Sequence, residues 1–289
     1  MFGPSVYATQ ALHGMVYGML LFLVSSGLTL VFGMMGILNI AHAAFYMLGA
    51  YLAYTTVAAT GSFWLSLLVA PIVVGLLGAA VERGLLRRIH RFGHAYELLL
   101  TFGLFYMMAE AVRWIWGNYT LEVPTPALLT GSIPLLGSQY PVYRLFILAF
   151  SALICLAMAT VLLRTRVGII IRSAVADGEM VSALGINTPL VALGVFSVGA
   201  ALAAIAGVIA APFLQADPAM GAAILVDSFV VVVVGGFGSL LGALLASLMI
   251  GELQSFGILW FPAFAMVFQF LLMAAVLVLR PQGLFGEKG

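Results

Sequence analysis

Residues Leu12 to Phe32 read LHGMVYGMLLFLVSSGLTLVF, an uncharged run long enough to cross the hydrocarbon core of a bilayer as one helix. The rest of the chain has the same character. Of its 289 residues, 64% are hydrophobic and only 7% are charged, and the mean hydropathy is +1.20. So few polar residues cannot cover the surface of a soluble globule of this length. The sequence therefore predicts an integral membrane protein.

The apolar runs predict an all-α, polytopic membrane protein that forms a single transmembrane domain over residues 1–289. About eight hydrophobic segments are expected, including broken or re-entrant helices where glycines interrupt a run. The expected segments lie near Leu12–Phe32, Ala41–Ala59, Phe63–Val81, Glu97–Trp116, Val142–Leu163, Pro189–Ala211, Leu225–Ile250 and Ile258–Leu279.

The grouping of the basic residues predicts the orientation of the chain. Cytoplasmic loops carry an excess of Lys and Arg, so the segments that hold the basic groups are expected inside the cell. These groups are Arg83, Arg87, Arg88 and Arg91; Arg164, Arg166 and Arg172; and Arg280 with Lys288. The Pro- and Gly-rich run 117–141 has no Lys or Arg and is expected outside. Counting crossings from there places the N-terminus outside and the C-terminus in the cytoplasm.

A glycine-rich interruption, GGFGS at residues 235–239, lies inside the expected segment Leu225–Ile250. We interpret this segment as a re-entrant pair, with Asp227 and Ser228 as a candidate helix cap. Backbone groups freed at membrane depth need protein or a water-filled cavity to satisfy them, so such breaks often line a pathway. Close helix packing through small residues is an alternative of equal weight. The candidate pathway residues are Gly235, Gly236, Gly238 and Ser239.

A second interruption separates the first two apolar runs and contains Asn39 and His42. Both side chains are costly in hydrocarbon unless they are paired. They are candidates to contact a substrate or to orient a broken helix, and a structural hydrogen bond between helices is the alternative. A metal site is not expected, because the other histidines offer no spacing that completes one with His42. Those histidines are His13, His90 and His94.

The expected cytoplasmic segment at about 164–188 contains the pattern of a short helix. Asp177 can cap a helix from Gly178 to Leu184, and Gly185 follows in the C-cap position. A helix of two turns is too short to be stable alone. Its apolar edge needs a docking surface, which would be a cytoplasmic ATPase subunit or the lipid headgroups. The edge consists of Met180, Val181 and Leu184.

Composition excludes several kinds of site. A nucleotide-binding P-loop needs a Lys after a glycine-rich turn, and the one lysine, Lys288, lies next to the end of the sequence. The chain is therefore expected to have no ATPase site of its own. A net charge of +1 offers no field that would attract nucleic acid. Cys155 is the only cysteine, so neither a disulfide nor a thiolate metal site can form within the chain.

Five separated elements carry a family resemblance that covers nearly the whole chain. The first is Asn39-Ile40-Ala41-His42-Ala43, followed by Met47-Leu48-Gly49-Ala50-Tyr51. The second comprises Arg172, Ala174, Val175, Ala176, Asp177, Ala183, Gly185, Ile186 and Asn187. The third and fourth are Phe196, Gly199, Ala201, Leu202, Ala203, Ala206 and Gly207, then Val234, Gly235, Gly236, Gly238, Ser239, Gly242 and Ala243. The fifth is Arg280, Pro281, Gly283, Leu284 and Gly286. In this order they resemble the permease subunits of branched-chain amino acid ABC importers, of the kind named LivH.

The resemblance implies a transport subunit of the bacterial inner membrane rather than an enzyme. An external binding protein would deliver the amino acid, a second permease subunit, expected to be a paralogue, would complete the path, and two cytoplasmic ATPase subunits would use ATP and Mg. No cofactor is expected on this chain itself. The implied ATPase contact comprises Arg172, Asp177, Glu179, Ala183 and Gly185. The implied border of the path comprises Asn39, His42, Gly235, Gly236, Gly238 and Ser239.

One departure from the family pattern leaves the substrate open. Ala43 and Ala44 stand where the family commonly has a Gly and an acidic residue, so urea, short amides or aromatic acids are alternative ligands. A passive channel ranks second, and a secondary transporter is disfavoured because its coupling ion needs groups near the midplane. The candidates Glu97, Glu110 and Arg113 lie toward helix ends. A membrane enzyme ranks third, because serines such as Ser25, Ser26 and Ser239 have no neighbouring His or Asp in sequence.

Overall fold

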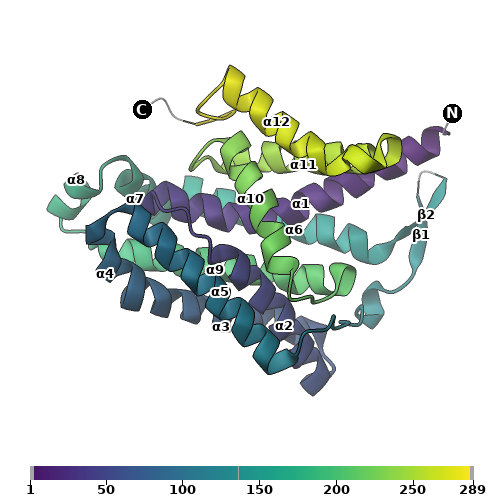
Figure 1. The fold of residues 1–289 in the computed structure, drawn as a ribbon, viewed down its shortest axis with the longest axis horizontal. Coiled ribbons are helices and arrows are strands. Elements are labelled where there is room, and N and C mark those ends of the chain that lie inside the picture. The colour runs from purple at the N-terminus through teal and green to yellow at the C-terminus, as the bar shows by residue number, and fades with distance from the viewer. Residues whose placement is uncertain (1–2, 136, 287–289) are drawn as a thin grey trace.

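The computed structural model describes residues 3–135 and 137–286, and it is almost entirely helical (Figure 1). Lys288, expected on the cytoplasmic tail, lies outside the described residues. Within them, 7 helices are long and apolar enough to cross a membrane, which confirms the all-α, polytopic membrane fold. The main helices are α1 (Pro4–Met35), α2 (His42–Thr60), α3 (Phe63–Val81), α5 (His94–Trp116), α6 (Val142–Arg164), α9 (Thr188–Leu214), α10 (Met220–Gly235), α11 (Leu240–Trp260) and α12 (Ala265–Leu279).

Short elements connect these helices. A π-helix, η1 (Glu82–Leu86), continues α3 into α4 (Arg87–Ile89) and the 3-10 turn η2 (His90–Phe92). The run 117–141, expected as a loop, contains the 3-10 turn η3 (Ala127–Leu129) and an antiparallel hairpin of β1 (Ser132–Leu135) and β2 (Ser138–Pro141). The remaining short elements are α7 (Arg166–Ala176), α8 (Gly178–Ala183) and η4 (Pro262–Phe264).

Helix α1 is the centre of the fold. It packs against α6, α9, α10 and α11, and 78% of its most apolar stretch is buried, against 11% for α6. A helix that is apolar on all sides lies either in a core or in lipid. The buried fractions identify α1 as a core helix. Most of the apolar surface of α6 is left to contact lipid or another subunit.

Helices α1 and α11 run antiparallel in close contact because glycines face each other along both. A Cβ at Gly251 of α11 would overlap the backbone of Gly14 and Gly18, which form a small-xxx-small pair on α1. At the other end of α1, a Cβ at Gly33 would lie 3.2 Å from the Cα of Gly238. The helix pair is therefore fixed over most of its length.

The bundle has two ends of different character (Figure 1). One end, at the right of the view, carries the β1–β2 hairpin and the start of α1, and we call it the hairpin end. The other end carries α4, α7 and α8, and therefore the arginine groups of residues 83–91 and 164–172. We call it the arginine end. The separation of the arginine groups from the run 117–141 agrees with the sequence prediction that these segments lie on opposite sides.

Candidate functional site

The connection between α1 and α2 is the break that contains Asn39 and His42, and it is buried. Helix α1 ends at Gly36, whose φ of 67° is left-handed and whose N–H donates to the Phe32 carbonyl at 2.8 Å. The chain then passes through residues 37–41 before His42 begins α2. Asn39 and His42 are only 2% and 1% exposed. The chain therefore changes direction inside the protein rather than at its surface.

His42 fixes the start of α2 against the middle of α1. Its Nε2 donates a hydrogen bond of 2.9 Å to the Val24 carbonyl, which is the interhelical bond that the sequence analysis held as the structural alternative. Because Nε2 donates, Nδ1 of the neutral ring must be an acceptor. Within the described residues, that buried Nδ1 has no hydrogen-bond partner. One nitrogen of the ring therefore binds the backbone of α1, and the other accepts no hydrogen bond from a described residue.

Other polar atoms of this region also lack partners. Among the described residues, the buried Oδ1 and Nδ2 atoms of Asn39 and the hydroxyls of Ser25 and Thr29 on α1 form no hydrogen bond. A buried polar group without a partner costs about 1–3 kcal/mol. Native structures keep such groups where water, an ion or a ligand satisfies them. The role of Asn39 and His42 in transport stays a prediction.

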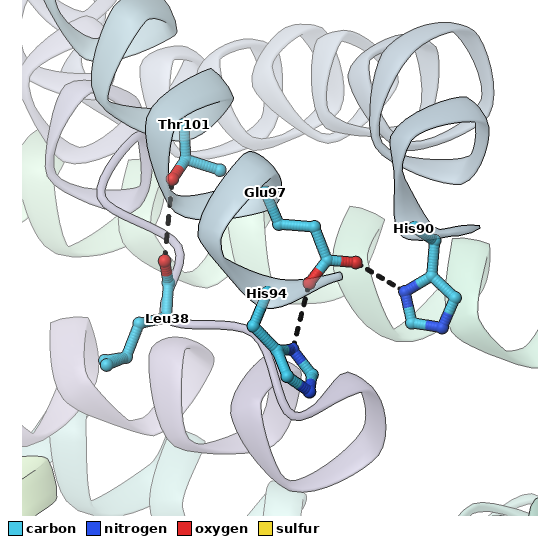
Figure 2. A network of polar contacts seen from close by, with 5 residues as sticks. All are labelled: Leu38, His90, His94, Glu97 and Thr101. Atoms are coloured by element: carbon cyan, nitrogen blue, oxygen red, sulfur yellow. Dashed lines mark hydrogen bonds and ion pairs between the residues drawn. The ribbon is translucent and has the colours of Figure 1, made fainter. Parts of the chain in front are cut away.

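Helix α5 holds the α1–α2 connection from the arginine end (Figure 2). The Thr101 hydroxyl lies 3.5 Å from the Leu38 carbonyl. One turn earlier, the fully buried Glu97 carboxylate lies between two exposed histidines, accepting from Nδ1 of His94 at 3.1 Å and from Nδ1 of His90. Glu97 is in the first turn of α5, where a negative charge is favoured by the helix dipole. The Thr101 contact thus ties the connection to α5, and the Glu97 contacts tie the first turn of α5 to η2.

The GGFGS interruption is a tight turn at the arginine end. Helix α10 ends at Gly235 and α11 begins at Leu240. Gly236 and Gly238 have φ values of 98° and 79°, which only glycine adopts without strain. Ser239 caps α11, because its Oγ accepts from the Gly242 N–H at 3.1 Å. The segment is therefore a pair of helices joined by a turn, and α11 continues beside α1 to Trp260. Its re-entrant path in the membrane stays a prediction.

The C-terminal tail closes the end of α10. The N–H groups of Leu284 and Phe285 donate to the carbonyls of Val234 and Gly235, at 2.8 and 3.0 Å. These carbonyls belong to the last turn of a helix, where backbone acceptors lack partners within the helix. The contacts of the turn thus favour the packing interpretation of Gly235, Gly236, Gly238 and Ser239. Their place at the border of a path stays a prediction.

Asp227 does not cap a helix, contrary to the sequence interpretation. Helix α10 begins at Met220, so Asp227 lies in its interior. Its carboxylate accepts from the Tyr17 hydroxyl at 2.7 Å and from Nε2 of Gln269 at 3.0 Å. These partners come from α1 and α12, which are distant in sequence. A charge in the middle of the bundle is therefore satisfied by tertiary contacts that a local cap pattern cannot reveal.

The predicted cytoplasmic helix is present as α8. Asp177 caps it, with Oδ1 accepting from the Met180 N–H at 2.8 Å, and Gly185 follows with a φ of 87°. The helix ends at Ala183, one residue before the predicted end. Within its apolar edge only Val181 is buried, whereas Met180 and Leu184 are 58% and 74% exposed. Val181 therefore packs against the protein, whereas Met180 and Leu184 are left exposed.

The other residues of the implied ATPase contact lie around this edge. Glu179 is in the first turn of α8, and both Glu179 and Ala183 are exposed. Arg172 lies on α7, and its guanidinium donates to the Leu162 carbonyl near the end of α6. The structure thus brings Asp177, Glu179, Ala183 and Gly185 together on one protrusion. It gives Arg172 a structural bond to α6.

Comparison with known proteins places this architecture in one family. Residues 10–277 match the family described as the permease component of branched-chain amino acid transport systems. The chain belongs to this permease family. BraD of Pseudomonas aeruginosa, a high-affinity branched-chain amino acid transport permease, is 29% identical over 97% of this chain and 96% of its own. LivH of Escherichia coli is 28% identical with the same coverage, and the probable LivH of Methanocaldococcus jannaschii is 26% identical over 94% of this chain and 90% of its own. No solved structure gives a significant match.

One residue that borders a cavity, Arg144, was not predicted from the sequence. Arg144 lies near the start of α6 at the hairpin end, away from the arginine groups at the other end. It borders a cavity between α1, α6, α9 and α11. A single arginine inside the edge of an apolar run, opposite to the end favoured by the other arginines, is the signal that could have marked it.

Proposed function

We propose that this chain is a membrane-spanning permease subunit of an importer that moves branched-chain or related hydrophobic amino acids. Separate ATPase subunits would drive it by using ATP and Mg, an external binding protein would deliver the substrate, and a paralogous permease would form the other half of the path. Family membership over residues 10–277 carries this proposal. The permeases BraD and LivH supply the substrate class through their descriptions.

The α7–α8 protrusion supports the proposed ATPase contact. The bare apolar residues Met180 and Leu184 flank the anchored Val181, and the acidic Glu179 stands on the same short helix. Exposed apolar groups with a polar surround are typical of a protein–protein interface. Movement of an ATPase subunit would be transmitted to α9 and α7, because α8 packs on both.

The proposed orientation places the arginine end in the cytoplasm and the hairpin end outside. It rests on the arginine groups at the α4 and α7 end and on the preference of Lys and Arg for cytoplasmic segments. The inner membrane of a bacterium is then the proposed location. In this orientation α8 faces the ATPase subunits, and the hairpin faces the binding protein.

Replacement of Gly185 by Val tests the ATPase contact. Gly185 has open space around it but a φ of 87°, so a β-branched residue would strain the end of α8 by about 1–3 kcal/mol without any clash. We expect ATP-driven uptake of leucine in proteoliposomes of the complex to fall at least about tenfold, since the docking helix changes shape. The folded permease should still be recovered from the membrane in normal amounts.

Gly194→Val is the matched control, because Gly194 on α9 also has open space, its φ is not left-handed and it lies outside α8. It should retain uptake. Mass spectrometry of the complex extracted gently from native membranes would identify the companions of both variants. Full uptake by Gly185→Val with a normal complement of ATPase subunits would contradict the assignment of α8. Transport by the chain alone without ATP would contradict the importer proposal itself.

A further inference from the structure

A cavity of about 240 Å³ opens near the hairpin end, between the first turns of α1 and the last turns of α11. Ligand sites for drug-sized molecules are about 300–1,000 Å³, so this cavity suits a smaller solute. Its walls differ in chemistry. Polar groups of Arg144, His13 and Gln254 line one part, and the apolar side chains Val16, Phe213 and Ile258 line another.

Arg144 supplies a positive charge to the cavity that no carboxylate of the described residues neutralises. Its Nη1 donates to Nδ1 of His13 at 2.5 Å, which requires that nitrogen to be an unprotonated acceptor. The guanidinium also lies 4.8 Å from the centre of the Phe213 ring. Among the described residues, no carboxylate oxygen is within ion-pair distance of Arg144. The comparable Arg113 at the same end is paired with Glu110 at 2.5 Å.

Gln254 supplies the opposite kind of group. Its Oε1 is buried and accepts no hydrogen bond from any described residue, and the residue lines the cavity. An acceptor without a donor is unfavourable unless something brings a donor to it. The neighbouring Tyr17 cannot do so with the hydroxyl hydrogen that it donates to Asp227. The cavity is therefore bordered by a cation that no described carboxylate pairs and by a glutamine whose buried Oε1 no described donor satisfies, beside an apolar wall.

These three features match the three parts of an aliphatic amino acid. We propose that the cavity is a binding site at the external end of the permease, where Arg144 binds the α-carboxylate and Gln254 accepts from the ammonium group. The apolar wall of Val16, Phe213 and Ile258 would contact the side chain. The site deepens the proposed function and rests on it, because the direction of import and the amino acid substrate come from there.

Arg144, Gln254 and the apolar wall together favour an amino acid over a lipid phosphate as the ligand. A lipid headgroup phosphate would use Arg144 equally well, but it would leave the Gln254 acceptor unpaired. A short aliphatic side chain also fills the apolar wall of a cavity of this size. The experiment must still separate the two sources of anion.

Cysteine protection measures occupancy of the cavity directly. Ile258 lines the cavity and is 53% exposed, so Ile258→Cys in a Cys155→Ser background gives one thiol at its rim. The complex is placed in nanodiscs of neutral lipid and labelled with a water-soluble maleimide, with leucine, leucinamide or no addition. We expect leucine to slow labelling several-fold and leucinamide, which lacks the carboxylate, to have little effect. Tyr119→Cys, exposed at the hairpin end outside the cavity, should label at one rate throughout.

Charge variants then test Arg144. In the Ile258→Cys background, Arg144→Gln should raise the leucine concentration needed for protection at least about tenfold, because a charge-assisted bond is lost. Arg113→Gln is the matched control, since that arginine is already paired, and it should leave protection unchanged. Arg144→Lys keeps the charge and should retain part of the protection.

Three results would overturn the site. Labelling that ignores leucine, protection that survives Arg144→Gln, or protection that appears only in nanodiscs containing an anionic lipid would each do so. ATP-driven uptake is measured on the same preparation. Uptake without protection would remove this site and leave the proposed function standing. Protection without uptake of any amino acid would support the site and contradict the importer function.

Discussion

Between α1 and α2 the chain passes through the core, and buried polar atoms of Asn39 and His42 find no partner among the described residues. Between α10 and α11 it turns with its helix ends capped. Ser239 closes the start of α11, and the backbone of residues 284–285 closes the end of α10. Both breaks begin with a glycine of left-handed φ that follows an apolar helix, Gly36 in the first and Gly236 in the second. They differ in whether the polar groups at the break are hydrogen-bonded to other described residues.

This difference separates two uses of a broken helix in a membrane. Unpaired groups at depth are costly and persist where a polar solute or water visits. Paired groups with left-handed glycines fix the relative position of two helices. The contacts therefore favour the α1–α2 connection as a candidate path and the α10–α11 turn as a structural junction. Three substitutions can break or sharpen that contrast.

The largest effect is expected for Gly236→Leu. Gly236 has a φ of 98°, and a Cβ there would overlap the backbone of Gly286 and Gln282. Backbone strain and overpacking each cost about 1–3 kcal/mol, so we expect a destabilisation of several kcal/mol and little assembled complex. Size-exclusion chromatography after heating would measure it. Gly194→Leu, with open space and no left-handed φ, is the control. Normal assembly of Gly236→Leu would show that the junction is dispensable.

An effect of intermediate size, and of opposite kind, is expected for Asn39→Leu. The change removes two buried atoms that have no partner, so the free energy of unfolding should stay the same or rise by about 1–2 kcal/mol. Leucine uptake should nevertheless fall at least about tenfold, because a polar group at the candidate path is lost. Denaturant titration and proteoliposome uptake, read together, check this.

Ser151→Ala is the matched control for Asn39→Leu. The Ser151 hydroxyl on α6 is also buried and, among the described residues, has no partner. It should tolerate removal with uptake unchanged. A clear loss of stability in Asn39→Leu would mean that its amide is paired in the assembled permease, and the contrast between the two breaks would disappear.

The smallest effect is expected for Ser239→Ala. Loss of an N-cap costs about 1 kcal/mol, within a range of about 0.5–2, so the unfolding midpoint should shift slightly and uptake should change less than about twofold. The same two assays measure it. A strong loss of uptake at normal stability would move the turn from the structural junction to the transport path.

The sequence predicted the structure correctly where it depends on interactions between residues that are close in sequence. Asp177 and Gly185 mark the two ends of α8 by capping and by a left-handed backbone, both of which depend on a few neighbouring residues. The apolar lengths likewise predicted most membrane helices, and α2 begins at His42, one residue after the predicted start. Family membership then confirmed the resemblance drawn from five motifs.

The sequence did not predict features that depend on contacts between residues far apart in the chain. The expected segment Ile258–Leu279 is present with its predicted end, but it starts four residues later, because α11 continues to Trp260 and the next span begins at Pro262. Asp227 resembled a cap but is held by Tyr17 and Gln269 from other helices. The proposed role of Arg144 follows only from its hydrogen bond to His13 and from the absence of a described carboxylate nearby. Such contacts depend on packing, which no window of the sequence contains.

The bond between residues 284–285 and the end of α10 has a consequence for biosynthesis. Those residues follow every membrane helix in the chain, so they leave the ribosome last among the parts described. Until they emerge, the carbonyls of Val234 and Gly235 remain open even if all helices are already inserted. A ribosome that stalls before Leu284 would thus yield a nearly complete but unlatched permease, which the cell's membrane proteases could distinguish from the finished one.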